Sequence, residues 1–321
     1  MRKVFTVAVL TLALVSGLEA QTPAVTPTLA LSPVPLWVRN GDTSQLPKDQ
    51  HVFYDPPAAE YVVYYAGNSP GVPSAQPTII RFGSHALVEP EVTLAVASNS
   101  DGSFHYTYSV ANGSRARQPI QEIGVFVFYD RSPRGSHPTW TAKVVPQNFR
   151  DLATPGTSQA SIEWTTNAAA RAIAPGSAVP GFAIDSTSLP GFVTMVFQGE
   201  SQSNQYTPDA VQSLPQEVRD QLAGIFERDV NSGLVIGPRF SKGTSQSTIT
   251  QNFVYGIQVL INRRKLDRNS PFVENAKRVL TAQLLSQDQM QLDSASLAFT
   301  KDAKTDVEKE IANALEVAFA Q

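Results

Sequence analysis

The chain has 321 residues, of which 42% are hydrophobic, with 23 prolines, 19 glycines and a formal net charge of −3. This length suffices for one large domain or two ordinary ones, and the nearly balanced charge gives no reason to expect a nucleic-acid or anionic-membrane partner. The sequence contains no cysteine, which excludes disulfides, thiolate zinc sites, cysteine nucleophiles and a cysteine-linked lipid anchor.

Residues 1–20 have the three parts of a secretory signal peptide. Arg2 and Lys3 form the positive start, residues 4–15 the apolar centre, and residues 17–20 a small-residue exit with cleavage expected after Ala20. The alternative is a membrane anchor, but the apolar run is shorter than the roughly 20 residues that span a bilayer, and no later segment is long and apolar enough. We therefore expect a secreted or periplasmic protein without a membrane span after signal removal.

Residues 21–50 form a lead-in rich in Pro, Thr and Ser. One apolar group, Leu36-Trp37-Val38, interrupts this composition. We expect an extended segment whose Trp37 docks on the domain that follows.

Residues 51–205 are predicted to form an antiparallel β-sandwich of about ten strands. In the run from Phe104 to Val110, apolar and polar residues alternate with the period of two that a half-buried strand requires. Asp101-Gly102 before it is typical of a hairpin turn. The run from Ile120 to Tyr129 is apolar on both faces, as expected for a central strand. The further strand candidates are His51–Tyr54, Glu60–Ala66, Thr78–Phe82, Thr139–Val145, Ala160–Thr165, Gly181–Ser186 and Gly191–Glu200.

Residues 206–321 are predicted to be a helical region of three to four short helices. Apolar residues there recur every three or four positions, after the helix-start signal Thr207-Pro208-Asp209. The segment from Asn231 to Gln246 is expected to be a connector. The helical patterns end at Phe226, Leu260, Leu284 and Phe319.

The motifs of common active sites are missing from the sequence. No GxSxG, GxGxxG, GxxxxGK[ST] or HExxH occurs, and His51, His85, His105 and His137 include no pair at helical spacing. Serine and histidine neighbours on a strand point to opposite faces, so they form no catalytic pair. We predict no catalytic, cofactor-binding or metal-ligating residue, and no cofactor.

Tyrosines of the β region are the residues that could bind a ligand. Exposed aromatic rings bind sugars and peptides because a rigid flat face meets a polar rim. Tyr61, Tyr65, Tyr106 and Tyr108 are the candidates. The alternative is that these rings fill the sandwich core and pair across strands.

Three segments resemble a loose group of uncharacterised secreted bacterial proteins. These segments are YTYSVANG with the following IQEIGVFVF, then APGSAVPGFAIDSTSLPGFVTMVFQGE, and VNSGLVIGPRF before short helices. In that group an immunoglobulin-like sandwich precedes a helical segment. The resemblance covers roughly residues 90–285 and implies the same fold here, with no catalytic residues to transfer.

Two functions are compatible with this sequence. The favoured one is a secreted or envelope-associated, non-enzymatic binding or structural protein, with an envelope protein or a glycan as partner. The alternative is a secreted carbohydrate-active hydrolase, whose carboxylates would converge from loops and lie about 5 to 9.5 Å apart in one cleft. Its candidate carboxylates are Glu60, Glu89, Glu91, Asp130 and Asp151.

Overall fold

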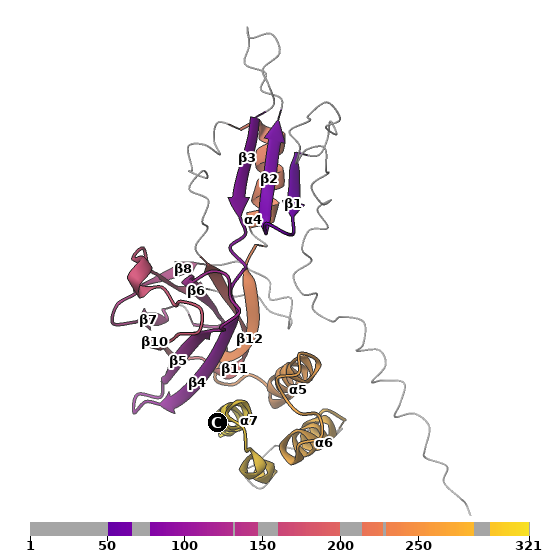
Figure 1. Ribbon diagram of the computed structural model, residues 1–321. Helices are drawn as coiled ribbons and strands as arrows, with labels where there is room; N and C mark the ends of the chain where they lie inside the picture. The colour runs from indigo at the N-terminus through magenta and orange to yellow at the C-terminus, as the bar shows by residue number, and fades with distance from the viewer. Residues whose placement is uncertain are drawn as a thin grey trace, which may run out of the picture.

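The computed structural model describes residues 51–65, 78–130, 132–146, 160–199, 214–226, 229–285 and 296–320. It is mostly antiparallel β-structure in a sandwich-like arrangement with four α-helices, largely C-terminal, and so confirms the predicted fold class. Figure 1 shows the sandwich between a smaller sheet, which packs on a helix, and the C-terminal helices. The predicted signal peptide and the lead-in with Trp37 lie outside the described residues.

Two antiparallel sheets make the sandwich. The four-stranded sheet has the order β4 (Pro90–Ser98), β5 (Phe104–Asn112), β10 (Ala178–Ser186) and β7 (Arg134–Ser136). The five-stranded sheet has the order β12 (Asn231–Phe240), β11 (Leu189–Gly199), β6 (Ile120–Val127), β9 (Ala160–Thr165) and β8 (Thr141–Pro146). Neighbours in each list pair in antiparallel register, so β4, β7, β8 and β12 are the sheet edges.

The aromatic face of β5 points into the sandwich. Tyr106 and Tyr108 are both 0% exposed. The Tyr106 hydroxyl donates to the Ser188 carbonyl at 2.7 Å, and the Tyr108 hydroxyl donates to the Ile236 carbonyl at 3.2 Å. Each buried hydroxyl therefore has the acceptor that it needs.

The first three strands form a sheet of their own. β1 (Val52–Asp55), β2 (Glu60–Tyr65) and β3 (Thr78–Gly83) pair in that order. Helix α4 (Gln216–Phe226) covers one face of this sheet, since Val218, Leu222 and Ile225 share a buried cluster with Val52 and Val63. The apolar stripe of α4 therefore packs on β1–β3.

The expected connector after residue 230 is instead strand β12. Two glycines and a proline made this segment look like a loop, yet it pairs with β11 along its length. Gly237 is needed there because a Cβ atom would come within 2.6 Å of Val193 and 3.0 Å of the Tyr108 hydroxyl. The glycine marks a close approach inside the core and not a turn.

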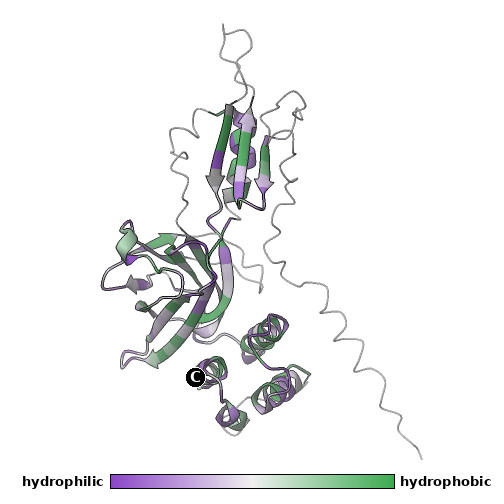
Figure 2. Ribbon diagram, in the orientation of Figure 1, coloured by the Kyte–Doolittle hydropathy of each residue, from purple (hydrophilic) through white to green (hydrophobic). Residues whose placement is uncertain are grey.

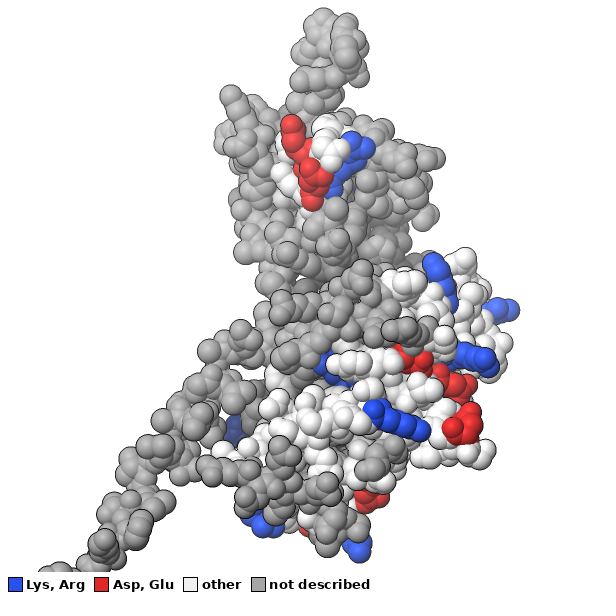
Figure 3. Space-filling model, turned by 180° about the vertical axis from the view of Figure 1, so that it is seen from behind, with Lys and Arg blue, Asp and Glu red and all other residues white. Residues whose placement is uncertain are grey.

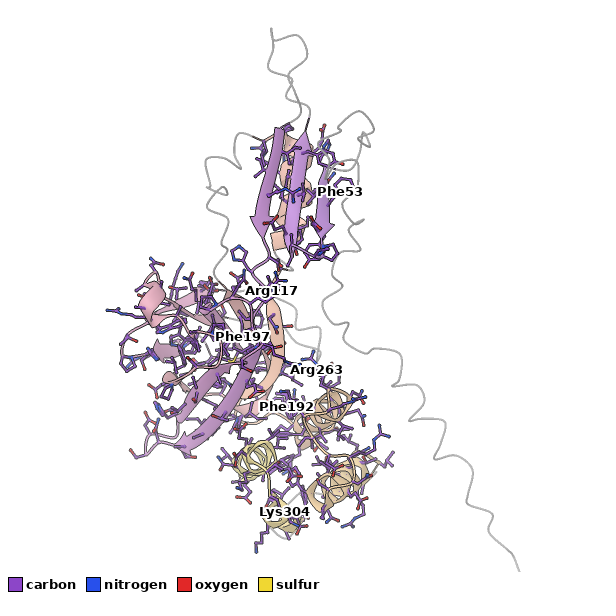
Figure 4. All side chains as sticks on the ribbon, viewed as in Figure 1. Phe53, Arg117, Phe192, Phe197, Arg263 and Lys304 are labelled. Atoms are coloured by element: carbon purple, nitrogen blue, oxygen red, sulfur yellow. The ribbon has the colours of Figure 1, made fainter. Side chains whose placement is uncertain are left out.

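Three helices complete the described chain: α5 (Gln246–Asn262), α6 (Pro271–Leu285) and α7 (Asp306–Phe319). Their apolar residues join the same buried cluster as the sandwich. Figure 2 shows hydrophobic and hydrophilic residues mixed around each of these helices, as expected for helices with one buried side. Figure 4 places Phe192 of β11 at the junction with the helices, where its ring contacts Gly256 of α5. Among the described helices, none has both the length and the apolar character to cross a membrane.

Candidate functional site

The predicted ligand-binding tyrosines lie mostly in the two cores. Tyr61 is buried in the small sheet, and Tyr106 and Tyr108 are buried in the sandwich. The side chain of Tyr65 lies outside the described part of the chain. A ligand cannot stack on the three buried rings without opening the cores, so they follow the core-filling alternative. The alternation of residues in β5 predicted that its aromatic side chains share one face, but it did not indicate that this face points inward.

Tyr61 takes part in a buried network around Asp229. This carboxylate, 4% exposed, accepts hydrogen bonds from the Tyr61 hydroxyl at 2.9 Å, the Ser84 hydroxyl at 2.5 Å and the His85 N–H at 2.6 Å. Burial, and then the charge of Asp229, hold the pKa of Tyr61 well above its usual range. The His85 carbonyl accepts from the N–H of Gly199 at 2.7 Å. The network therefore joins the small sheet to β11 of the sandwich.

An exposed aromatic ring occurs instead at Tyr129, directly after β6 and Phe128. Tyr129 is 53% exposed, and its φ of 59° lies in the left-handed region. For a residue with a Cβ atom this conformation costs about 1–2 kcal/mol. A strained residue persists only where its surroundings fix it, and such residues occur preferentially at functional sites.

Hydrogen bonds fix the residue before Tyr129. The Phe128 N–H donates to the Pro238 carbonyl at 3.1 Å, and the Phe128 carbonyl accepts from the Ser188 hydroxyl at 2.5 Å. The guanidinium of buried Arg239 lies 3.8 Å from the centre of the Phe128 ring. A cation stacked on an aromatic ring and removed from water contributes about 2 kcal/mol.

The residue after Tyr129 is fixed as well. The buried carboxylate of Asp130 accepts from the Ser186 hydroxyl at 2.7 Å, the Thr187 N–H at 2.8 Å and the Ser132 N–H at 2.9 Å. Hydrogen bonds thus tie Phe128 to the β10–β11 turn and to β12, and tie Asp130 to the β10–β11 turn. Buried polar contacts therefore stabilise a backbone conformation in which the Tyr129 ring is exposed to solvent.

A row of neighbouring residues, most of them polar, crosses the outer face of the four-stranded sheet at the end of the sandwich where Asp130 binds Ser186. Ala97, His105, Asp185 and Arg134 are register partners on β4, β5, β10 and β7. The His105 Nδ1 and Asp185 Oδ1 atoms are 2.6 Å apart, and Arg134 is exposed. Asp185 directly precedes Ser186 and Thr187, the residues that bind Asp130. We call Tyr129, Thr187, Arg134, Asp185 and His105 the recognition surface.

The described carboxylates proposed for a hydrolase do not all meet in one place: Glu89 and Glu91 lie together at the start of β4, whereas Glu60 and Asp130 lie elsewhere. Glu60 pairs with Arg81 in the small sheet at 3.3 Å, and Glu91 lies 3.9 Å from Lys265. Glu91 pairs in register with Ala111 of β5, whereas Asp130 binds Ser186, which pairs with Phe104 at the other end of β5. That spacing is roughly 23 Å along the strand. Glu89 precedes β4 at the Glu91 end, where it pairs with Arg115 at 3.4 Å, and Asp151 lies outside the described residues.

Sequence reasoning missed one pair of acidic residues. Glu122 of β6 and Glu163 of β9 point outward from the five-stranded sheet. Burial, and then the charge of Glu163, raise the pKa of Glu122. The outward alternation of both strands could have suggested this pair. Within the described ranges, no three His, Cys, Asp or Glu side chains are grouped so that they could hold a metal ion. In Figure 3, seen from behind, basic and acidic side chains of the described residues are interspersed over the sandwich.

Comparisons with known proteins give distant structural similarities. No protein-family model and no curated protein matches the chain. An uncharacterized protein from Nocardia farcinica with an immunoglobulin-like fold is 18% identical over 45% of this chain and 96% of its own, with a TM-score of 0.26.

Two modules from Clostridium are also distantly similar. A biomass-sensing module from Clostridium thermocellum that resembles family 3 carbohydrate-binding modules is 14% identical over 31% of this chain and 65% of its own, with a TM-score of 0.25. A cohesin module from a Clostridium perfringens family 33 glycoside hydrolase is 6% identical over 49% of this chain and 98% of its own, with a TM-score of 0.23.

Proposed function

We propose that this chain is a secreted or envelope-associated, non-enzymatic binding protein that recognises a glycan through the recognition surface. The observation that carries this proposal is the exposed Tyr129 ring, held in a left-handed backbone conformation by buried hydrogen bonds on both sides. A ring carried on a fixed backbone loses less conformational freedom on binding than a ring on a flexible loop.

The surroundings of the ring favour a glycan over an envelope protein. The other large hydrophobic side chains that are exposed among the described residues are Ile79, Val144 and Leu285, and each belongs to a different element. A protein partner is usually bound by a cluster of apolar and aromatic residues that becomes fully buried. A single exposed ring at the end of the sandwich that also carries the polar side chains of His105, Asp185 and Arg134 suits a sugar, since sugars combine apolar C–H faces with many hydroxyl groups.

Export is part of the proposal. Residues 1–20 would direct the chain across the membrane and would be removed after Ala20. N-terminal sequencing of the protein recovered from periplasm and culture medium tests this step. The expected first residue is Gln21, and an intact Met1 in both fractions would contradict it.

The test of ligand binding uses depletion from solution by insoluble cellulose, chitin, xylan and peptidoglycan. The Tyr129→Asn variant removes the ring, and asparagine tolerates the left-handed backbone well, so folding is preserved. We expect this variant to bind the retained polysaccharide roughly tenfold or more weakly, because burying an aromatic side chain contributes about 1.5–3 kcal/mol. Tyr129→Phe, which keeps the ring, should bind nearly as well as the unchanged protein.

The matched control is Leu285→Ala, which removes an exposed apolar side chain on α6. Equal binding by Tyr129→Asn and the unchanged protein would overturn the assignment of the site. Retention of a solubilised envelope protein, with no polysaccharide bound, would replace the glycan with a protein ligand. Release of reducing sugar from any of the polysaccharides would favour the hydrolase.

A further inference from the structure

The edges of the two sheets differ in how they are protected. Strand β8 lies at the edge of the five-stranded sheet, and Val144 on it is 42% exposed. It carries Lys143 in its centre and ends at Pro146. A lysine and a proline on an edge strand are known devices against the addition of another strand, since one resists burial and the other lacks an N–H. Strand β8 is therefore protected by its own sequence.

Strand β4 at the edge of the other sheet lacks such residues in its centre. From Val92 to Ala97 it contains neither a charged residue nor a proline. It is nine residues long and pairs with β5 over its whole length. A long edge of this composition is a template for pairing with another strand.

Helix α7 covers the β4 edge with side chains that take the place of a neighbouring strand. The Leu94 N–H donates to the Glu310 carboxyl at 2.8 Å, and the Val96 carbonyl accepts from the Asn313 amide at 3.2 Å. Figure 1 shows α7 beside β11 and β4 at the open side of the sandwich, and α7 contacts both strands. Since these two backbone groups point to α7, the outward hydrogen-bonding positions of β4 are the even-numbered residues.

We propose that β4 is a latent strand-addition edge closed by α7, and that two copies of this chain pair through β4 when α7 leaves it. The sequence of β4 is self-complementary in an antiparallel pair with its twofold axis at Leu94. Val92 then lies opposite Val96 of the second copy, and Thr93 lies opposite Ala95 of the second copy. In this register Leu94 of both copies forms a hydrogen-bonded pair, as the outward direction of its N–H requires.

Charge also permits this register. Glu91, the charged residue of β4, lies opposite Ala97 of the second copy, so no like charges face each other. The inward faces of both strands remain apolar and continuous with the sandwich cores. A second copy is thus a better occupant than an unrelated strand, whose side chains would have to match both faces.

Ionisation of Glu310 supplies the means of release. Burial raises the pKa of this carboxyl to about 7, Asp306 on the preceding turn of α7 adds to the rise, and the Leu94 N–H opposes it. Above that pH a half-buried carboxylate lies between helix and strand, which favours separation of the two. Below it the neutral carboxyl keeps α7 on β4.

The first test removes both side-chain contacts with β4 and leaves the apolar face of α7 intact. Analytical ultracentrifugation of the Glu310→Ala/Asn313→Ala variant is expected to show a concentration-dependent doubling of mass at about pH 5, where the neutral Glu310 of the unchanged protein keeps that protein monomeric. The Leu285→Ala variant, changed at an exposed position of α6, is the control for a helix substitution away from β4. A folded double variant that stays monomeric at every concentration overturns the proposal.

The second test does not depend on that variant. The chain has no cysteine, so Thr93→Cys and Ala95→Cys variants each carry a single thiol on the exposed face of β4. In the proposed register these positions face each other across two copies at about 4.5 Å between Cα atoms, which suits a disulfide.

With the same added disulfide oxidant in every sample, an equimolar mixture of the two single-cysteine variants should form several-fold more mixed disulfide than either variant alone forms symmetric disulfide. The mixture should form more at about pH 9 than at about pH 5 after correction for thiol ionisation. Thr141→Cys on β8 gives the background rate for an exposed thiol. A mixture no more reactive than its components at either pH contradicts pairing through β4. Mixed disulfide formed equally with Thr141→Cys contradicts the register.

Discussion

The side chain of Asn252 in α5 binds both backbone groups of Phe192 in β11. Its Oδ1 atom accepts from the Phe192 N–H at 2.7 Å, and its Nδ2 atom donates to the Phe192 carbonyl at 3.1 Å. β6 pairs with β11 only from Met195 onward, so the first half of β11 has an open side there. One amide side chain thus supplies the hydrogen bonds that a neighbouring strand would make.

Removal of this amide should destabilise the protein. Asn252→Ala leaves a buried N–H and a buried carbonyl of Phe192 without partners, and we expect the free energy of unfolding to fall by about 2–4 kcal/mol. Urea denaturation followed by tryptophan fluorescence measures the change. Gln258→Ala on the exposed side of the same helix is the control and should change stability little. Equal effects of both substitutions would mean that the Asn252 contacts are not specific.

Loss of the Asp229 carboxylate should also destabilise the protein, and the small sheet should be affected before the sandwich. Asp229→Ala removes the acceptor of the Tyr61 hydroxyl, the Ser84 hydroxyl and the His85 N–H. We expect a loss of about 2–4 kcal/mol, with faster hydrogen exchange in β2 and β3 than in β5 and β6. Asp220→Ala, on the exposed side of α4, is the matched control. Uniform acceleration across both sheets would contradict a role of Asp229 in joining the two parts.

Because the pKa of Glu310 is raised, we expect the free energy of unfolding to fall at alkaline pH. Its pKa is raised from 4.5 to about 7, so the folded state holds this proton more tightly than the unfolded state does. The contribution of the neutral carboxyl is therefore fully present below about pH 4.5 and is lost as pH rises through about 7. The loss is at most about 3 kcal/mol and smaller where water screens the group.

The Glu310→Gln variant separates this effect from the rest of the titration. Glutamine still accepts from the Leu94 N–H but carries no charge, so the variant should be more stable than the unchanged protein at about pH 8.5 and similar at about pH 5. Thermal unfolding at both pH values checks this. A stability difference that is independent of pH would show that Glu310 does not titrate in this range.

For His137 we expect the opposite pH dependence: the free energy of unfolding should fall as the pH is lowered. Its Nδ1 atom accepts from the N–H groups of Thr139 and Trp140, both at 3.0 Å, and its Nε2 faces the Pro180 carbonyl at 3.1 Å. The ring stacks on Phe182, with centroids 4.3 Å apart. Burial lowers the pKa of His137, whereas the hydrogen bond to Pro180 partly opposes the decrease.

Protonation of His137 requires the loss of the two hydrogen bonds that Nδ1 accepts. Because the folded pKa is below the unfolded value, the stabilisation is present above about pH 6.5 and is lost as pH falls through the folded pKa. In the His137→Asn variant, whose side-chain oxygen can accept the same N–H groups, this part of the acid dependence should disappear. Histidine titration by NMR gives the direct measurement, and a pKa above 6.5 would contradict the expectation.

Local chemistry made the centre of the sandwich predictable. The alternation from Phe104 to Val110 gave β5, the doubly apolar run gave β6, and Asp101-Gly102 gave the turn, where Gly102 has a φ of 78°. These features depend on neighbours in sequence. The C-terminal helices were predictable for the same reason, because the stripe from Val307 to Phe319 carries its own period.

The candidate site depends on partners far apart in the sequence. Asp130 is fixed by Ser186 and Thr187, and Phe128 by Pro238. Nothing near Tyr129 in the sequence shows that its backbone is left-handed or its ring exposed. The same limit explains why β12 looked like a connector, since its glycines and proline have their meaning only beside β11 and β5.

The small sheet and its covering helix are separated in the sequence by most strands of the sandwich. Strands β1 to β3 end at Gly83, whereas α4 begins at Gln216, after β11. A ribosome adds residues at about 5–20 per second, so this sheet waits on the order of ten seconds for its helix. During that interval its apolar face has no α4 to cover it, and export from the N-terminus would deliver it across a membrane in that condition. The newly made chain should therefore depend on a chaperone that binds its first strands, although the main hydrophobic core of the finished protein lies in the sandwich.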